Sequence, residues 1–321
     1  MDMRFTGAVP EKEMFQVIGE TFEQLFEEDQ RVVYLDADLM GSLKTQELWK
    51  KYPHNVFNCG IQEANMVGVA CGMYLNGFKP YIHTFTPFAS RRVFDQLFIS
   101  VAYAKKSIRV IGSDAGIMAT HNGGTHMCFE DIAMMRTVPN ACIVDVSDPS
   151  MMRAFMRLSK DYPGLTYLRT ARRGAPDIYM DDTPFEIGKA KVLRTGDDVT
   201  LIGCGIMVAT CLKAADLLEK DGIHARVIDV VTIKPLDTET ILRAARDTEL
   251  IVTAENANVI GGLGSAVSEF LSENCPTHVI KVGINDCFGC VGSEAFLREK
   301  YGLTEQHIVD KVKKQLVKRR G

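Results

Sequence analysis

The chain has 321 residues, which is enough for about two domains of ordinary size. Hydrophobic residues make up 46% of it, charged residues 24%, and the net charge is −4. These values exclude a small disulfide scaffold, a disordered chain and a general attraction to nucleic acid. The best apolar run is interrupted by Glu63 and Asn65, so we expect no membrane span and no membrane partner.

In the first half of the chain, apolar runs of strand length alternate with helical patterns. This alternation is typical of crossover units around a mainly parallel sheet. The expected strands are Arg31–Leu35, Val56–Cys59, Lys79–His83, Ile108–Ser113, Ala141–Val146 and Leu165–Arg169.

A break follows at Gly174–Pro184, where one Gly, two Pro and three Asp can continue neither a helix nor a strand. We therefore predict one domain over residues 1–180 and a smaller one over residues 187–321. The fold class is α/β, with two doubly wound domains. The second domain is expected to contain strands Val199–Gly203, Ala225–Val231, Leu250–Glu255 and Val279–Gly283 and helices Met207–Lys220, Thr238–Arg246, Gly264–Asn274 and one from about Thr304.

The last of these helices ends in a run of basic residues, including Lys318, Arg319 and Arg320. We interpret the run as cations at a helix C-terminus and a solvated face, and not as a nucleic-acid site.

The helix expected over Gln62–Tyr74 carries apolar or small residues on every face. Such a helix is surrounded by protein on all sides, which favours a subunit interface. Glu63 lies in its first turn, where the helix dipole alone would favour a carboxylate. Apolar surroundings would also desolvate Glu63 and raise its pKa, so a functional carboxylate is the alternative.

The nine cysteines are an odd number, lie in apolar segments and follow no recognisable secretory signal. This pattern predicts a reducing, cytoplasmic location. Cys287 and Cys290 are the one close pair. We interpret them as ordinary thiols, with half of a zinc site or a redox function as the alternative. No second such pair and no spaced His pair is present to complete the four ligands of a zinc site.

A polar, glycine-rich segment over residues 112–130 follows an expected strand. Loops at the carboxyl ends of parallel strands are where α/β proteins build their sites. The segment contains Asp114, His121, Asn122 and His126. A metal site is one alternative for these side chains, but no helical spacing or carboxylate triad supports it.

Several motifs in order resemble the C-terminal half of transketolase. They read Ala37-Asp38-Leu39 with Ser42, Asn58-Cys-Gly-Ile-Gln-Glu63-Ala-Asn-Met66, Tyr81-Ile-His-Thr-Phe85-Thr-Pro-Phe88-Ala-Ser-Arg-Arg92, Phe94-Asp-Gln96 and Gly123-Gly-Thr-His126. The resemblance runs from about Glu13 to the end of the chain. It implies a pyrimidine-binding domain of the thiamine-diphosphate enzymes followed by the smaller transketolase C-terminal domain.

The resemblance also implies thiamine diphosphate as cofactor. Transketolases hold its diphosphate and a divalent cation such as Mg²⁺ with a Gly-Asp-Gly motif and a downstream Asn, and this chain has no Gly-Asp-Gly. The cation ligands are therefore expected on an N-terminal transketolase subunit, with none in this chain. We expect a heterotetramer that self-associates through the pyrimidine-binding domain and acts on sugars.

The family's roles can be carried over position by position. Glu63 matches the Glu that bonds the cofactor's pyrimidine and promotes loss of its C2 proton, and His126 matches a His that faces the substrate; these two are the expected catalytic residues. The other cofactor positions are Asp38, Phe85, Phe88 and Arg91. The substrate positions are Ser42, Asp114, His121, Asn122, Arg169 and Arg172, with Ser42 and Arg169 expected to hold a sugar phosphate. For Arg91 and Arg172 a surface ion pair is an equal alternative.

Two positions depart from the family pattern, since most transketolases have Asp where this chain has Asn122 and His near Asp114. A carboxylate at 114 would weaken an anion site unless it faces Arg172 or His121. An unusual ketose donor, branched or sulfonated, is therefore an alternative to common sugar phosphates. The beta subunit of a 2-oxoacid dehydrogenase and a non-catalytic interaction subunit are the alternative functions.

Overall fold

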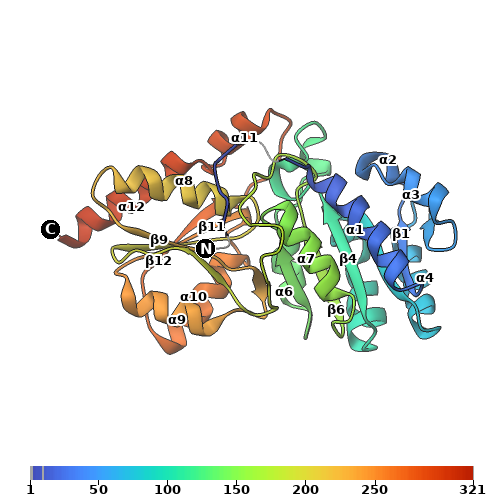
Figure 1. Ribbon diagram of the computed structural model, residues 1–321. Coiled ribbons are helices and arrows are strands. Elements are labelled where there is room, and N and C mark those ends of the chain that lie inside the picture. Colours follow the sequence, from blue (N-terminus) through green and yellow to red (C-terminus); the bar gives the residue numbers. More distant parts are fainter. Residues whose placement is uncertain (1–2, 9–10, 321) are drawn as a thin grey trace.

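The structure is a computed structural model that describes residues 3–8 and 11–320, with residues 318–320 described by their backbone alone. The side chains of Lys318, Arg319 and Arg320 in the basic run therefore lie outside the described residues. Two α/β domains lie side by side, the first in blue to green and the second in yellow to red (Figure 1).

A seven-stranded sheet forms the first domain, in the order β10-β5-β6-β4-β3-β1-β2. Its strands are β1 (Val32–Asp36), β2 (Val56–Asn58), β3 (Lys79–Phe85), β4 (Ile108–Ser113), β5 (Cys142–Asp145), β6 (Leu165–Arg169) and β10 (Thr232–Lys234). All neighbours are parallel except β10, which pairs antiparallel with β5. The carboxyl ends of the six parallel strands therefore meet along one edge.

Helices cover both faces of this sheet. Alternate residues of β1 point to opposite faces, so Tyr34 packs with α1 (Met14–Glu28) and α7 (Pro149–Ser159). Leu35 points to the opposite face, which is covered by α4 (Glu63–Leu75), the π-helical segment Gln96–Tyr103 and α6 (Asp131–Arg136). Short helices follow the strands: α2 (Met40–Leu43), α3 (Gln46–Lys51), α5 (Thr86–Ala89) and single 3-10 turns at Arg91–Val93, Gly116–Met118 and Gly123–Thr125.

The second domain has a five-stranded sheet in the order β12-β11-β8-β9-β7. The strands are β7 (Lys191–Arg194), β8 (Val199–Gly203), β9 (Ala225–Asp229), β11 (Ile251–Asn258) and β12 (Val279–Ile284). The helices are α8 (Met207–Glu219), α9 (Thr238–Asp247), α10 (Leu263–Asn274), α11 (Glu294–Lys300) and α12 (Glu305–Arg320). Figure 1 shows the sheet between α8 with α12 on one side and α9 with α10 on the other. No helix in the described ranges combines the length and the apolar character that a bilayer crossing requires.

Every strand expected from the sequence is present, with ends that differ by at most three residues. Two short strands, β7 and β10, were not expected. Both are antiparallel strands at the edges of their sheets, three or four residues long, and too short to show a periodic pattern. Strand β10 also crosses from the second domain to the sheet of the first.

The segment at 174–184, expected as a break between domains, is irregular but not exposed throughout. Ile178 and Tyr179 are fully buried, and their backbone N–H groups donate to Asp148 Oδ2 at 2.9 and 2.8 Å. The Tyr179 hydroxyl donates to Asp229 Oδ2 of the second domain at 2.8 Å. Burial raises the pKa of both Asp148 and Asp229 to about 6. This segment therefore binds the two domains together.

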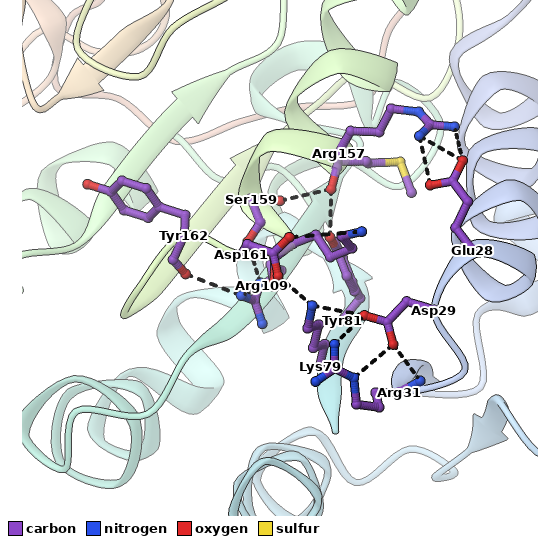
Figure 2. A network of polar contacts seen from close by, with 12 residues as sticks. Glu28, Asp29, Arg31, Lys79, Tyr81, Arg109, Arg157, Ser159, Asp161 and Tyr162 are labelled. Carbon is purple, nitrogen blue, oxygen red and sulfur yellow. Dashed lines mark hydrogen bonds and ion pairs between the residues drawn. The ribbon is translucent and has the colours of Figure 1, made fainter. Parts of the chain in front are cut away.

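Charged side chains form a network at the amino-terminal ends of the strands of the first sheet, opposite to the carboxyl ends (Figure 2). Arg109 of β4 is 2% exposed, and its guanidinium donates to the carbonyls of Ser159, Lys160 and Tyr162 at the end of α7. Lys79 Nζ at the start of β3 pairs with Asp29 at 2.9 Å and also with Asp161. Hydrogen bonds from Arg31 and Lys79 hold the pKa of Asp29 well below its usual range. The network joins α7 to the strand starts.

Candidate active site

The carboxyl ends of β1, β3 and β4 are tied together by a buried polar chain. His83 Nδ1 lies 2.7 Å from Asp36 Oδ2, and His83 Nε2 lies 3.0 Å from Ser113 Oγ. The Tyr34 hydroxyl also donates to Asp36, and all four side chains are fully buried. The sequence did not indicate this chain of residues, although three of them lie at the carboxyl ends of neighbouring strands. It fixes the strand ends from which the site loops depart.

Glu63 occupies the first turn of α4, as expected, and is buried. Its Oε1 accepts a hydrogen bond from Arg92 Nη1 at 2.6 Å. The Arg92 guanidinium also lies over the Phe88 ring, 3.9 Å from the ring centre. Arg92 ends the motif that begins at Tyr81, and the sequence did not predict a role for it. Its pairing compensates the buried carboxylate charge in this chain.

Three rings meet beside this ion pair. The centres of Phe85 and Phe88 are 6.3 Å apart, and the His126 ring lies 5.8 Å from Phe85 and 5.3 Å from Phe88, edge-on to both. Phe85 ends β3 and Phe88 lies in α5, whereas His126 comes from the loop after β4. His126 Nδ1 lies 2.8 Å from Thr125 Oγ1, which orients the imidazole. The structure therefore brings these predicted residues together.

Asp114 faces Arg172, the condition under which a carboxylate is compatible with an anion site. Arg172 Nε donates to Asp114 Oδ1 at 3.0 Å, and its Nη1 donates to the backbone carbonyl of Ser42 at 2.9 Å. The guanidinium lies 5.9 Å from the centre of the Phe85 ring. Burial raises the pKa of Asp114, against the opposing effect of Arg172. Arg172 is thus held beside the Phe85 ring by Asp114 and the backbone of Ser42.

A cavity of about 360 Å³ opens beside this ion pair. Its lining comes from both domains: Asp114, Met118, Thr120, His121, Arg172, Arg173, Gly174, Ser293 and Glu294. Since Arg172, Arg173 and His121 are among the lining residues, the cavity offers hydrogen-bond donors to an anionic group.

The second domain holds the loop that carries Asp114 and His126. Asn256 of β11 accepts from the Ile117 N–H and donates to the Ala115 carbonyl, each at 3.0 Å. Gly116 between them has a φ of +58°, and a Cβ there would lie 2.2 Å from the Asn256 carbonyl oxygen. Only glycine fits this close approach.

Arg169 does not join the site, which corrects its predicted contact with a sugar phosphate. Its side chain is 1% exposed, and it pairs with Asp131 at 2.8 Å and with Asp145 at 3.1 Å. Its Nη2 also donates to the Asn256 carbonyl at 2.6 Å. A guanidinium enclosed by two carboxylates has no free face for an anion. The sequence pattern missed this because Asp131 and Asp145 are distant along the chain.

The remaining predicted residues lie around the cluster. Asp38 is exposed, with a φ of 63°, and accepts from Asn58 Nδ2 at 2.9 Å. Arg91 forms an exposed ion pair with Glu130 at 3.0 Å, the alternative considered for it. The loop residue Asn122 is exposed, as is His121, whose Nδ1 lies 2.7 Å from Thr120 Oγ1. In the described residues, no group of three or more His, Cys, Asp or Glu side chains is placed to hold a metal ion.

Two family models cover most of the chain. The model of the transketolase pyrimidine-binding domain matches residues 11–176, and that of the transketolase C-terminal domain matches residues 188–308. The chain therefore belongs to the transketolase family.

Among the relatives of the chain are proteins named as separate subunits of a transketolase. The chain is 47% identical over 283 residues to the 6-deoxy-6-sulfo-D-fructose transketolase subunit SqwH of Clostridium sp. strain MSTE9, a match that covers 88% of each chain. It is 35% identical over 290 residues to a subunit of the apulose-4-phosphate transketolase of Phocaeicola vulgatus, covering 90% of this chain and 93% of that one. A solved structure described as a split-gene transketolase, inactive beta4 tetramer, superposes with a TM-score of 0.87 and 40% identity, covering 95% and 98%.

The chain is thus one subunit of a split, thiamine-diphosphate-dependent transketolase, a transferase that moves a two-carbon ketol unit from a ketose to an aldose. These relatives favour that function over the beta subunit of a 2-oxoacid dehydrogenase and over a non-catalytic interaction subunit.

Proposed function

We propose that the cluster around Glu63 and Phe85 is the pyrimidine half of a thiamine-diphosphate site. The residues fit the group: Phe85 and Phe88 offer apolar ring faces, and a buried carboxylate stands beside them. When bound, the cofactor would supply the nucleophilic carbon for ketol transfer. Phe85 and Phe88 would hold its aminopyrimidine ring, with Asp38 and Arg91 at the rim.

Glu63 would exchange a proton with the ring nitrogen N1′ of the pyrimidine. A carboxyl group at that position can accept the proton and return it. Arg92 pairs with Glu63 in the isolated chain, so we expect Arg92 to shift when the cofactor binds. His126 would bond to the sugar hydroxyls and to the oxygen that gains charge during the reaction.

The cavity beside Arg172 would take the far end of the sugar. Arg172 and His121 would donate hydrogen bonds to a terminal anionic group, with Asp114 holding Arg172 in place, while Ser42 and Asn122 would bond to the chain of hydroxyls. Arg169 is not part of the proposed substrate site, because its guanidinium is enclosed by carboxylates.

The donor we propose is a ketose with a terminal sulfonate or phosphate, other than the common pentose phosphates. The relatives named above act on 6-deoxy-6-sulfo-D-fructose and on apulose 4-phosphate, by their names. Asp114 lines the cavity where the terminal group would bind, and Asn122 directly follows the lining residue His121 in the chain.

A second subunit would supply what this chain lacks. We propose an N-terminal transketolase subunit that carries Gly-Asp-Gly and a downstream Asn and that holds Mg²⁺ and the diphosphate. Two copies of each chain would form a heterotetramer in the cytoplasm, a compartment that suits nine free thiols.

Contact between two copies of this chain would run along α4. Outward-facing Gly68 and Gly72 have open space where a Cβ would be, and Val69 and Ile61 are 37% and 70% exposed. A helix expected to be surrounded by protein thus has one face uncovered in the single chain. That face begins beside Glu63, so a second copy would complete the wall of the site.

The observation that carries the proposal is the meeting of Glu63, Arg92, the two phenylalanine rings and His126 at one sheet edge. It predicts that the chain alone neither binds thiamine diphosphate tightly nor transfers ketol units, because half of the site is missing. Calorimetric titration with thiamine diphosphate and Mg²⁺, with and without the N-terminal subunit, tests this. Micromolar binding and turnover by this chain alone would contradict it.

A further inference from the structure

The loop between β12 and α11 carries two thiols that the proposed reaction does not use. Cys287 is exposed and Cys290 is half-buried. Two residues separate them, which is the spacing of the Cys-X-X-Cys motifs that undergo disulfide exchange. The chain's other seven cysteines are buried or half-buried.

Two hydrogen-bond donors converge on Cys290. Lys300 Nζ lies 3.1 Å from its Sγ, and the Tyr301 hydroxyl lies 3.5 Å from it. The same hydroxyl lies 3.0 Å from the Phe288 carbonyl, which ties α11 to the middle of the loop. Hydrogen bonds from Tyr301 and Lys300 lower the pKa of Cys290, whereas burial raises the pKa of Cys59. A cation at hydrogen-bond distance stabilises the thiolate, the reactive form of cysteine.

This loop is in direct backbone contact with the loop that carries His126. A Cβ on Gly124 would lie 2.8 Å from the Gly289 carbonyl oxygen, and the Gly292 N–H donates to the Thr120 carbonyl at 3.2 Å. Gly289 lies between the two cysteines. We call the loop that carries His126 the substrate loop. A change in the backbone from 287 to 290 therefore acts directly on the substrate loop, because the two backbones are in contact at Gly289 and Gly124 with no space between them.

We propose that Cys287 and Cys290 are a thiol pair that low-molecular-weight disulfides oxidise, and that its oxidation lowers ketol transfer. The Cys290 thiolate attacks one sulfur of the reagent, whose S–S bond breaks and releases one thiolate. The Cys287 thiol then loses its proton to solvent and attacks the Cys290 sulfur, which releases the second thiolate. The protein loses two electrons, and the reagent becomes two thiols. Lys300 and Tyr301 are the groups that make Cys290 the first to react.

The chemical test uses the full chain treated with glutathione disulfide and analysed by intact mass and peptide mapping. We expect the wild type to lose two mass units through a Cys287–Cys290 bond. Cys287→Ser should accumulate one glutathione on Cys290, and Lys300→Met should slow that reaction about three- to tenfold. Half-buried Cys59 is the comparator within the same chain. Equal labelling of Cys59 and Cys290, or no effect of Lys300→Met, would overturn the assignment.

The functional test uses the complex with the N-terminal subunit. Oxidation should lower ketol transfer at least threefold, dithiothreitol should restore it, and Cys287→Ser with Cys290→Ser together should be insensitive to glutathione disulfide. A Cys287–Cys290 bond that forms without any change in rate would overturn the link to the substrate loop. Disulfide mapping reads the thiols without reference to the transferred sugar, so its result is independent of the proposed function.

Discussion

Charged side chains of the same types lie at both ends of the strands of the seven-stranded sheet. They differ in whether their hydrogen-bonding groups are all paired within the protein. We call the two ends the amino-terminal edge and the carboxyl edge. At the amino-terminal edge, the Arg109 guanidinium donates to several carbonyls, and Lys79 bridges two aspartates (Figure 2). At the carboxyl edge, Arg172 makes one carboxylate contact and one carbonyl contact and lines an open cavity. The first edge joins the strand starts to α7, whereas the second leaves donors free for a ligand.

The second domain produces part of this difference. It packs against the carboxyl edge and holds the loop after β4 through Asn256, so this edge becomes a cavity between two domains. Arg169 lies near the same edge but is enclosed by Asp131 and Asp145. A strand-end arginine is therefore a ligand donor only where carboxylates do not already surround it.

The largest expected effect is on stability, at the enclosed arginine. Arg169→Met removes the cation and leaves Asp131 and Asp145 buried without a counter-ion, which costs about 3–5 kcal/mol of unfolding free energy. Urea unfolding followed by circular dichroism measures it. Exposed Arg173→Met on the same edge is the matched control and should change stability by less than about 0.5 kcal/mol. Equal effects of the two changes would contradict the distinction.

The next effect is catalytic. Glu63→Gln keeps the shape and the fold but cannot exchange a proton, so the reconstituted enzyme should lose more than about 100-fold in kcat/KM, or ~3 kcal/mol. Glu47→Gln, in the first turn of exposed α3, is the matched helix-start control and should have full activity. If Glu63→Gln retains more than half of the rate with cofactor bound, Glu63 is only a helix-start carboxylate.

A third test uses the pH dependence of stability to distinguish two regions, the contact between the domains at Asp229 and the amino-terminal ends of the strands at Asp29. The pKa of Asp229 is raised from 3.8 to about 6 by burial, so the folded state binds its proton more tightly than the unfolded chain. The contribution of Asp229 to the free energy of unfolding is fully present below pH 3.8 and is lost as the pH rises to about 6. The loss is at most about 3 kcal/mol.

Asp229→Asn should therefore reduce the dependence of the melting temperature on pH between 4 and 6, and the part that is left comes from Asp148, whose pKa is also raised to about 6. Asp29, whose pKa is lowered, should behave oppositely: its contribution is present above pH 3.8 and is lost as the pH falls below that value. Asp29→Asn should flatten only the acid limb. A wild-type melting temperature whose slope over pH 4–6 is unaffected by Asp229→Asn would contradict this assignment.

The smallest effect concerns donor choice. Asn122→Asp should shift the ratio of kcat/KM values between a sulfonated ketose and xylulose 5-phosphate by about tenfold or less, because one hydrogen-bonding group changes its charge. A ketose panel with the reconstituted enzyme measures the ratio. A preference for xylulose 5-phosphate that Asn122→Asp leaves unchanged would show that this departure carries no specificity.

The sequence by itself determined the two α/β domains and the expected strands, because each strand is a local apolar run between turn residues. The helical pattern also placed Glu63 at a helix start, and the resemblance of the motifs to transketolase placed Phe85, Phe88 and His126 in one site. These predictions depend on residues close together in the chain or at carboxyl ends of adjacent parallel strands. The roles assigned to them remain predictions.

Only the tertiary structure decided which polar groups are already satisfied. Arg169 and Arg172 are three residues apart, yet one is enclosed by Asp131 and Asp145 and the other lines the cavity. Strand β10 likewise leaves its own domain to pair with β5. The physical reason is the same in both cases. Burial and hydrogen-bond satisfaction depend on partners from distant segments, and a local pattern does not encode which segments those are.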